Sequence, residues 1–336
     1  MNRLKASTLA AQLVRIFGVL LLLSALAIPL VRAPDRPVET LVARWAPPPS
    51  EFLDLQGQLV HYRDEGPKTD PAPIVLLHGV SASLHTWEGW VKALRGQRRV
   101  ISLDLPAFGL TGPFAGPYAE KFADKFAGQA YTGAHYARFV LDVLDKLAVP
   151  RFVVAGNSLG GEVAWRIAAA APQRVAALVL VDSAGYPVEG GRVPLGWQIA
   201  RLPVLGHVVE HLLPRPFIVQ GLAAVYGDPK RITEAQVDRY YELTLRAGNR
   251  AALVARAQSW SRSEGVARIT GVSAPTLVLW GGRDQVLPPS LARRFIADIP
   301  GARLQVFDDL GHVPQEEDPA RTVAVVKAFL DGVAAR

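Results

Sequence analysis

The sequence contains no cysteine among its 336 residues. The chain therefore has no disulfide framework, no thiolate nucleophile and no cysteine-ligated zinc site. Runs of like charge are also missing. Residues 1–50 carry six basic and two acidic side chains, a net +4, which leaves +3 of the total +7 spread over the rest of the chain. A nucleic-acid-binding protein needs a basic stripe, so no nucleic-acid partner is expected.

Charge is absent as well from Ile16–Val31, sixteen residues that follow Arg3, Lys5 and Arg15. A membrane span needs about 20 apolar residues. Counting from Leu9 reaches that length if the Arg15 side chain extends toward the membrane surface. We expect a hydrophobic, membrane-anchoring transmembrane helix here. The alternative is a secretory signal peptide that is cleaved near Ala25-Leu26-Ala27.

The two N-terminal alternatives give related locations. A retained anchor would hold the catalytic domain at a lipid membrane, outside the cytoplasm, in the periplasm or the extracellular space; a cleaved signal would release it as a secreted protein. Residues 32–50 contain five prolines. Because such composition favours extended backbone, residues 1–50 are predicted to be an anchor or signal followed by a tether, and the folded part to begin near Glu51.

Short apolar runs alternate with amphipathic segments along most of the remaining chain. Residues 52–62 have the pattern of a β-hairpin. Buried strands are predicted at residues 73–77, 100–104, 151–155, 177–181, 276–280 and 303–307, and helices at 87–94, 135–147, 162–171, 291–299 and 319–332. Strands that alternate with helices indicate an α/β fold, a mostly parallel sheet with helices on both faces. Residues 51–185 and 269–336 are predicted to form this core.

Residues 186–268 break the alternation. They show helical pieces, six prolines and no clear strand. A helical insertion of this length between two strands does not join the sheet, and ligands bind at the carboxyl ends of parallel strands. We therefore expect an inserted helical cap, named here the cap segment, over those strand ends. Its aromatic residues Trp197, Phe217, Tyr226 and Trp260 favour an apolar substrate.

The stretch Gly156-Asn157-Ser158-Leu159-Gly160 joins a predicted buried strand directly to a predicted helix. A strand that turns into a helix within so few residues leaves no room for side chains, and glycine tolerates the close approach. Ser158 is then placed at the tip of a strained turn. This is the sequence context of a nucleophile elbow, which presents a serine hydroxyl at the top of the sheet.

A serine hydroxyl needs a base to take its proton and an acid to orient that base. Asp284 follows the predicted strand at 276–280, and His312 follows the last predicted strand. The chain order Ser158, Asp284, His312 is the one expected for such an elbow. Asp182 also follows a strand and is the alternative acid. His207 and His211 lie four residues apart but lack an H-E-x-x-H pattern, so neither a metal nor any other cofactor is expected.

Attack on a carbonyl creates a negative oxygen that backbone N–H groups must already face. One donor is expected from Leu159, because the first N–H groups of a helix have no intrahelical partner. The second is expected from Val80, which follows His78-Gly79 at the end of a predicted strand.

These motifs, in this order along the chain, together with Asp104–Gly109, Trp280–Asp284 and Gly311-His312, resemble the α/β-hydrolase superfamily, in its serine-nucleophile branch with a helical cap. The resemblance runs from about Glu51 to the C-terminus. Relatives with an aspartate nucleophile, such as epoxide hydrolases and haloalkane dehalogenases, are disfavoured by Ser158.

The resemblance implies a serine hydrolase, most simply a carboxylesterase that acts on small apolar esters through an acyl-enzyme. The first alternative is a C–C bond hydrolase that cleaves a vinylogous diketone with the same triad. The sequence Val80-Ser81-Ala82-Ser83, where such enzymes often carry a glycine-rich loop, makes this less favoured. A second alternative is a catalytically silent ligand-binding protein of the same fold.

Overall fold

The computed structural model describes residues 12, 14–19, 22, 32–122, 130–188, 198, 202, 210–259 and 266–334. Most of the predicted anchor segment, including the expected cleavage site, lies outside these residues. Within them, no helix combines the length and the apolar character that a membrane crossing requires.

Eight strands form one sheet in the order β1-β2-β4-β3-β5-β6-β7-β8. The predicted hairpin is confirmed, because β1 (Ser50–Leu55) pairs antiparallel with β2 (Gln58–Glu65), which pairs antiparallel with β4 (Val100–Leu103). All later pairs are parallel. The remaining strands are β3 (Ile74–Leu77), β5 (Phe152–Asn157), β6 (Val175–Val181), β7 (Thr276–Gly281) and β8 (Arg303–Phe307). The six predicted core strands are thus all present.

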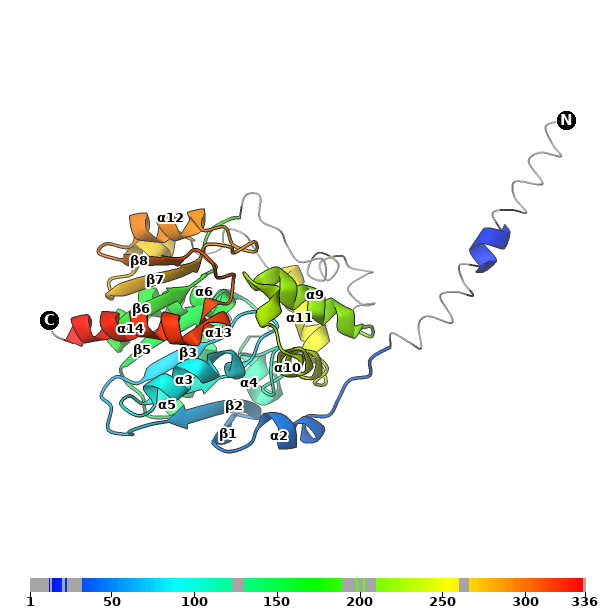
Figure 1. Ribbon diagram of the computed structural model, residues 1–336. Helices are drawn as coiled ribbons and strands as arrows, with labels where there is room; N and C mark the ends of the chain where they lie inside the picture. The colour runs from blue at the N-terminus through cyan, green and yellow to red at the C-terminus, as the bar shows by residue number, and fades with distance from the viewer. Residues whose placement is uncertain are drawn as a thin grey trace.

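Helices cover both faces of the sheet, as the alternating pattern predicts (Figure 1). Side chains of Ile74 and Leu76 join a core with the tryptophans of η1 (Leu84–Trp87) and α3 (Glu88–Leu94) and with α14 (Pro319–Ala334). Those of Val75 and Leu77 point the other way, toward α5 (Gly133–Lys146), α6 (Leu159–Ala170) and α12 (Ser290–Asp298). This period of two explains the nearly continuous apolar strands, since each face of a parallel sheet is buried.

Short elements connect these layers. They are α4 (Gly116–Glu120), η2 (Pro172–Arg174) and α13 (Pro314–Glu317). The cap segment contributes α9 (Arg215–Val225), η3 (Pro229–Arg231), α10 (Glu234–Thr244), α11 (Asn249–Ser259) and η4 (Val266–Gly271), and its described residues form no strand of the sheet. Figure 1 shows α9, α10 and α11 gathered beside one end of the sheet.

The expected extended tether over residues 32–50 is wrong for its central part. Residues 39–45 form α2 (Glu39–Trp45), and Leu41 on this helix is buried against Leu110 and Leu243. We call residues 32–49 the strap. Its prolines flank the helix rather than interrupt it, so the seven residues between Val38 and Ala46 are free to form intrahelical hydrogen bonds.

The strap is tied to the cap segment by backbone and side-chain contacts. The Arg36 N–H donates to the Leu245 carbonyl at 2.7 Å, and the Ala247 N–H donates back to the Arg36 carbonyl at 2.8 Å. Arg44 pairs with Glu242 at 2.7 Å. The folded part of the chain therefore begins before Glu51, at the strap.

Candidate active site

The predicted elbow is present. β5 ends at Asn157, α6 begins at Leu159, and Ser158 between them has φ 54° and ψ −114°. Ser158 is half-buried although its neighbours on both sides are buried. A Cβ on Gly156 would lie 2.1 Å from the Gly160 carbonyl oxygen, and one on Gly160 would lie 2.1 Å from that of Leu77. The two glycines are therefore required by the close approach of β5, α6 and β3.

His312 and Asp284 meet beside this turn. Asp284 follows β7 and His312 follows β8, which are neighbouring strands. The His312 Nδ1 lies 2.7 Å from the Asp284 Oδ2, and both side chains are buried. The Asn157 amide donates to the His312 carbonyl at 2.9 Å, which holds the histidine loop next to Ser158.

The Asp284 carboxylate is fixed at both oxygens. Its Oδ1 accepts hydrogen bonds from the backbone N–H groups of Val286 at 2.8 Å and Leu287 at 2.9 Å. Its Oδ2 is left for His312. Because the Nδ1 of His312 then carries its proton toward Asp284, the Nε2 is the ring nitrogen available as a base.

Asp182, the alternative acid, lies in the same cluster but does not take the place of Asp284. It follows β6, has φ 43°, and its Oδ1 accepts a hydrogen bond from the Gly281 N–H at 2.9 Å. Burial, and then the charge of Asp284, raise the pKa of Asp182 well above its usual range. The acid whose hydrogen bond reaches the histidine ring is Asp284.

The loop after β3 faces Ser158. A Cβ on Gly79 would lie 3.1 Å from the Ser158 Cβ, so the following residue, Val80, emerges beside the serine. Leu159 is the first residue of α6 and leaves its N–H outside the helical ladder. The two expected oxyanion donors thus flank the elbow, one on each side.

His78 holds this loop, a role that its sequence motif did not reveal. The Leu105 N–H donates to its Nε2 at 2.9 Å, which leaves a proton on Nδ1 to donate to the Gly79 carbonyl at 2.7 Å. Burial lowers the pKa of His78, so the ring stays neutral as this pattern needs. Only the tertiary position of Leu105 shows that both ring nitrogens are used.

Asp104 braces the turn that follows β4. It accepts hydrogen bonds from the backbone N–H groups of Leu84 at 2.7 Å and Leu110 at 2.8 Å, and it contacts the His61 Nδ1 at 2.7 Å. Burial opposes its charge, but the neighbouring histidines, His61 first, hold the pKa of Asp104 well below its usual range. His61 therefore belongs to this brace, because β2 pairs with β4 and brings it to Asp104.

The cap segment contacts the histidine loop directly. The His312 N–H donates to the carbonyl of Val225, at the end of α9, at 2.7 Å. Glu317 accepts hydrogen bonds from the N–H groups of Gly227 and Gly311 at 2.9 and 2.8 Å. Glu316 forms a buried ion pair with Arg239 of α10. The cap and the loop that carries His312 are thus one hydrogen-bonded unit.

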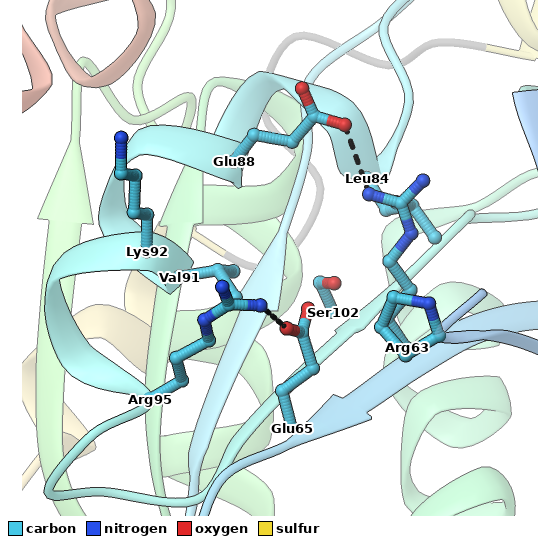
Figure 2. Close-up of a pocket in the computed structure, with 9 residues that line it drawn as sticks. Arg63, Glu65, Leu84, Glu88, Val91, Lys92, Arg95 and Ser102 are labelled. Carbon is cyan, nitrogen blue, oxygen red and sulfur yellow. Dashed lines mark hydrogen bonds and ion pairs between the residues drawn. The ribbon is translucent and has the colours of Figure 1, made fainter. Parts of the chain in front are cut away.

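Two hollows lie in the part of the chain that the structure describes. The larger, about 180 Å³, lies between α3 and strands β2 and β4, and its lining does not include Ser158, Asp284 or His312. Its charges are largely paired, Arg63 with Glu88 at 2.9 Å and Arg95 with Glu65 at 2.6 Å (Figure 2). The smaller, about 10 Å³, lies between the loop after β3 and the helices α10 and α11. It is the one that adjoins the elbow side of the sheet.

Among the described residues, one group has the spacing of metal ligands. A carboxylate oxygen of Asp182, one of Asp284 and a ring nitrogen of His312 lie within 4.8 Å of one another. The hydrogen bond between Asp284 and His312 already uses two of these groups. His207, of the pair with His211, lies outside the described residues.

Known proteins share this architecture. A family model described as the alpha/beta hydrolase fold matches residues 72–319. An uncharacterized protein of Mycobacterium tuberculosis is 29% identical over 305 residues, which cover 85% of this chain and 82% of that protein. A 2-hydroxy-6-oxononadienedioate/2-hydroxy-6-oxononatrienedioate hydrolase of Burkholderia vietnamiensis is 28% identical over 287 residues, 81% of this chain and 90% of that protein.

Solved structures agree. A membrane phospholipase A, described as a bacterial virulence factor, superposes with a TM-score of 0.66 at 25% identity, covering 100% of both chains. A meta-cleavage product hydrolase of Pseudomonas fluorescens superposes with a TM-score of 0.68 at 23% identity, covering 84% of this chain and 97% of that chain. With the elbow, the strand order and the family match over residues 72–319, the chain belongs to the α/β hydrolase fold family.

Proposed function

We propose that this protein is a serine hydrolase that cleaves carboxylic esters through an acyl-enzyme. The observation that carries the proposal is the half-buried Ser158 at a strained strand-to-helix turn, next to a buried pair of His312 and Asp284 at 2.7 Å. Three chain segments, after β5, β7 and β8, converge there. A glycine-rich turn with only a packing role has no need of this pair.

In the proposed reaction the Ser158 Oγ attacks the ester carbonyl carbon while His312 Nε2 takes its proton. The N–H groups of Val80 and Leu159 stabilise the negative oxygen, and the loss of one such donor typically raises the barrier by about 2.7–4 kcal/mol. His312 then gives the proton to the departing alcohol. Water, activated by the same histidine, releases the acid product and restores Ser158.

The contacts near the elbow favour an apolar substrate. The small hollow beside the loop after β3 has more apolar than polar side chains in its lining: Ala82, Ala107, Phe108, Leu243 and Leu253 beside Ser81, Thr244 and Asn249. Of the cap aromatics, Tyr226 is buried in a cluster with Leu222, Phe217 is exposed, and Trp197 and Trp260 lie outside the described residues. The similarity to a membrane phospholipase A, whose name denotes cleavage of a lipid ester, supports the same bond type.

A second function has its own support. The curated relative from Burkholderia is named as a hydrolase of a 2-hydroxy-6-oxo dienoate, a C–C bond substrate. The same serine, histidine and aspartate serve in that alternative. The ester is preferred because the chain carries Val80-Ser81-Ala82-Ser83 rather than a glycine-rich loop after Gly79.

We also propose that residues before the strap anchor the protein to a lipid membrane, with the catalytic domain outside the cytoplasm. The uncharged run Ile16–Val31 after three basic residues supports this, as does the similarity to a membrane phospholipase A. Cell fractionation tests it. Release of a chain that begins near Ile28 would instead identify a cleaved signal peptide and a secreted enzyme.

A substrate panel tests the catalytic proposal. Purified protein would be assayed with p-nitrophenyl esters of graded chain length and with a 2-hydroxy-6-oxo dienoate. Turnover of the esters by the native chain, but not by Ser158→Ala, is the expected result. Preferred turnover of the dienoate would favour C–C cleavage. No turnover of either, in a chain that still binds them, would favour a silent ligand-binding protein.

A further inference from the structure

A second buried carboxyl group lies against the histidine–aspartate pair, and the proposed reaction does not use it. Asp182 is completely buried, and its Oδ2 has no hydrogen-bond partner among the oxygens and nitrogens of the described residues. An oxygen of Asp182, an oxygen of Asp284 and a ring nitrogen of His312 lie within 4.8 Å of one another. At this distance a negative charge on one carboxyl group disfavours a negative charge on the other. The question is where the negative charge of this cluster resides.

The hydrogen bonds place the negative charge on Asp284. This residue accepts three of them: two from backbone N–H groups and one from the His312 ring. Asp182 receives one, from the Gly281 N–H. A carboxylate is stabilised by each donor it accepts. Asp284 is therefore the ionised member, and an ionised Asp182 would leave its Oδ2 as a buried charge with no donor, which is strongly unfavourable.

The charges around Asp182 support this assignment. Among the described residues, the groups whose charge most affects the pKa of Asp182 are Asp284 and Glu317, both acidic, and both oppose a second negative charge. Glu317 itself accepts N–H groups of Gly227, Asp228 and Gly311 and is satisfied as a carboxylate. The fourth ionisable group, His312, already donates to Asp284.

We propose that Asp182 retains its proton and directs it toward Asp284, an oxygen of which lies within 4.8 Å of an Asp182 oxygen, so that Asp182 is a positioning residue for the acid of the triad. This rests on the proposed function only in its consequence for turnover. A neutral donor at this point fixes the Asp284 rotamer that faces His312. It also keeps a second negative charge away from the imidazole, which would otherwise hold its proton too tightly to return it to the leaving group.

Asp182 also has an uncommon backbone conformation. Its φ of 43° lies in the left-handed region, which aspartate tolerates better than most residues. The Asp182 N–H donates to the Leu279 carbonyl at 3.0 Å, and two residues further on the Ala184 N–H donates to the Ser158 carbonyl at 3.0 Å. The loop after β6 thus joins the elbow to the strand that carries Asp284.

The test compares Asp182→Asn with Asp182→Ala, and uses Ser183→Ala as the matched control. An asparagine amide can accept from Gly281 and donate to Asp284 without a charge. We expect kcat within about threefold of the native chain, and an acidic limb of the kcat/KM profile that moves by less than about 0.3 pH unit, for Asp182→Asn and for Ser183→Ala. We expect Asp182→Ala, which lacks the donor, to lose roughly tenfold or more in kcat.

If Asp182 were ionised, the Asp182→Asn variant would behave differently. Removing a negative charge this close to His312 would lower the acidic limb by roughly 1–3 pH units in Asp182→Asn. A loss of roughly 10⁴-fold in kcat for Asp182→Asn would make Asp182 the acid of the triad. Either result overturns the proposal. If Asp182→Ala does not fold, the asparagine variant alone still decides between these outcomes.

A spectroscopic reading separates this proposal from the proposed function, because it needs no substrate. Infrared difference spectra at pH 7 should show the carbonyl stretch of a protonated carboxylic acid in the native chain and its loss in Asp182→Asn. That band supports the proposal even if no ester is turned over. Its absence from the native chain overturns the proposal even if the enzyme is an active esterase.

Discussion

Replacing Leu41 by alanine measures how strongly the strap is held. The side chain is 1% exposed and packs against Leu110 and Leu243, one before α4 and one in the cap segment. A buried Leu→Ala change destabilises a protein by about 2–5 kcal/mol. For a chain of 336 residues that corresponds to a fall of roughly 3–7 °C in the melting temperature.

Arg44→Ala is the matched control on the same helix. Arg44 pairs with Asp238 at 2.9 Å and with Glu242 at 2.7 Å, but its side chain is 50% exposed. Ion pairs in such surroundings contribute about 0–1 kcal/mol. Thermal unfolding and urea titration of both variants should therefore separate them clearly. If Leu41→Ala were as mild as Arg44→Ala, the strap would not be packed in solution as the structure has it.

Because the strap is packed against the cap segment, a shortened chain should keep it. A chain that starts at residue 32 keeps the strap and should unfold with the same stability as the full-length chain. A chain that starts at residue 51 loses Asp35, the ion-pair partner of Arg250 at 2.6 Å. Arg250 is 3% exposed. Its unpaired charge should cost roughly 3 kcal/mol, the low end for buried pairs because Asp35 is partly exposed. Equal stability of the two shortened chains would refute this.

Other changes test the rest of the structure. Asp284→Asn should lower kcat about 10⁴-fold because His312 would adopt the wrong tautomer; a smaller loss than for Asp182→Asn in the same ester assay would exchange the two acids. Gly160→Ala, which places a Cβ 2.1 Å from the Leu77 carbonyl oxygen, should abolish soluble, active protein, whereas an unaffected variant would contradict the elbow geometry. Arg239→Ala should cost about 3–5 kcal/mol in urea unfolding, because Glu316 would keep a buried charge; a change below about 1 kcal/mol would contradict the buried Arg239–Glu316 ion pair. Burial lowers the pKa of His85 from 6.5 to about 3. Below pH 6.5 the unfolded chain binds a proton at His85 and the folded chain does not, so this residue lowers the free energy of unfolding by about 1.4 kcal/mol per pH unit between pH 6.5 and pH 3. The His85→Gln variant should show a shallower dependence of stability on pH in this range.

The fold was largely readable from the sequence because its signals are local. Each parallel strand is a short apolar run between breakers, and Ser158 lies in a turn whose glycines mark a close approach of backbones. The order of Ser158, Asp284 and His312 then followed from strand ends that share one edge of the sheet. Such features depend on neighbours within a few residues.

The errors concern contacts between distant segments. The strap reads as a tether because its prolines dominate the local pattern, while the contact of Leu41 with Leu243 spans two hundred residues of sequence. The contact of His61 with Asp104 likewise depends on the pairing of β2 with β4. The double use of the His78 ring depends in the same way on Leu105. No local signal reports these pairings.

Covalent labelling of Ser158 tests the central claim most directly. The native chain would be treated with a fluorophosphonate, digested and analysed by mass spectrometry, beside Ser158→Ala and His312→Ala. One adduct on the peptide that contains Ser158, absent from Ser158→Ala and much slower in His312→Ala, is the expected result, because the hydroxyl needs the histidine as its base. Labelling at another residue, or at Ser158 with an unchanged rate in His312→Ala, would contradict the assignment of this triad.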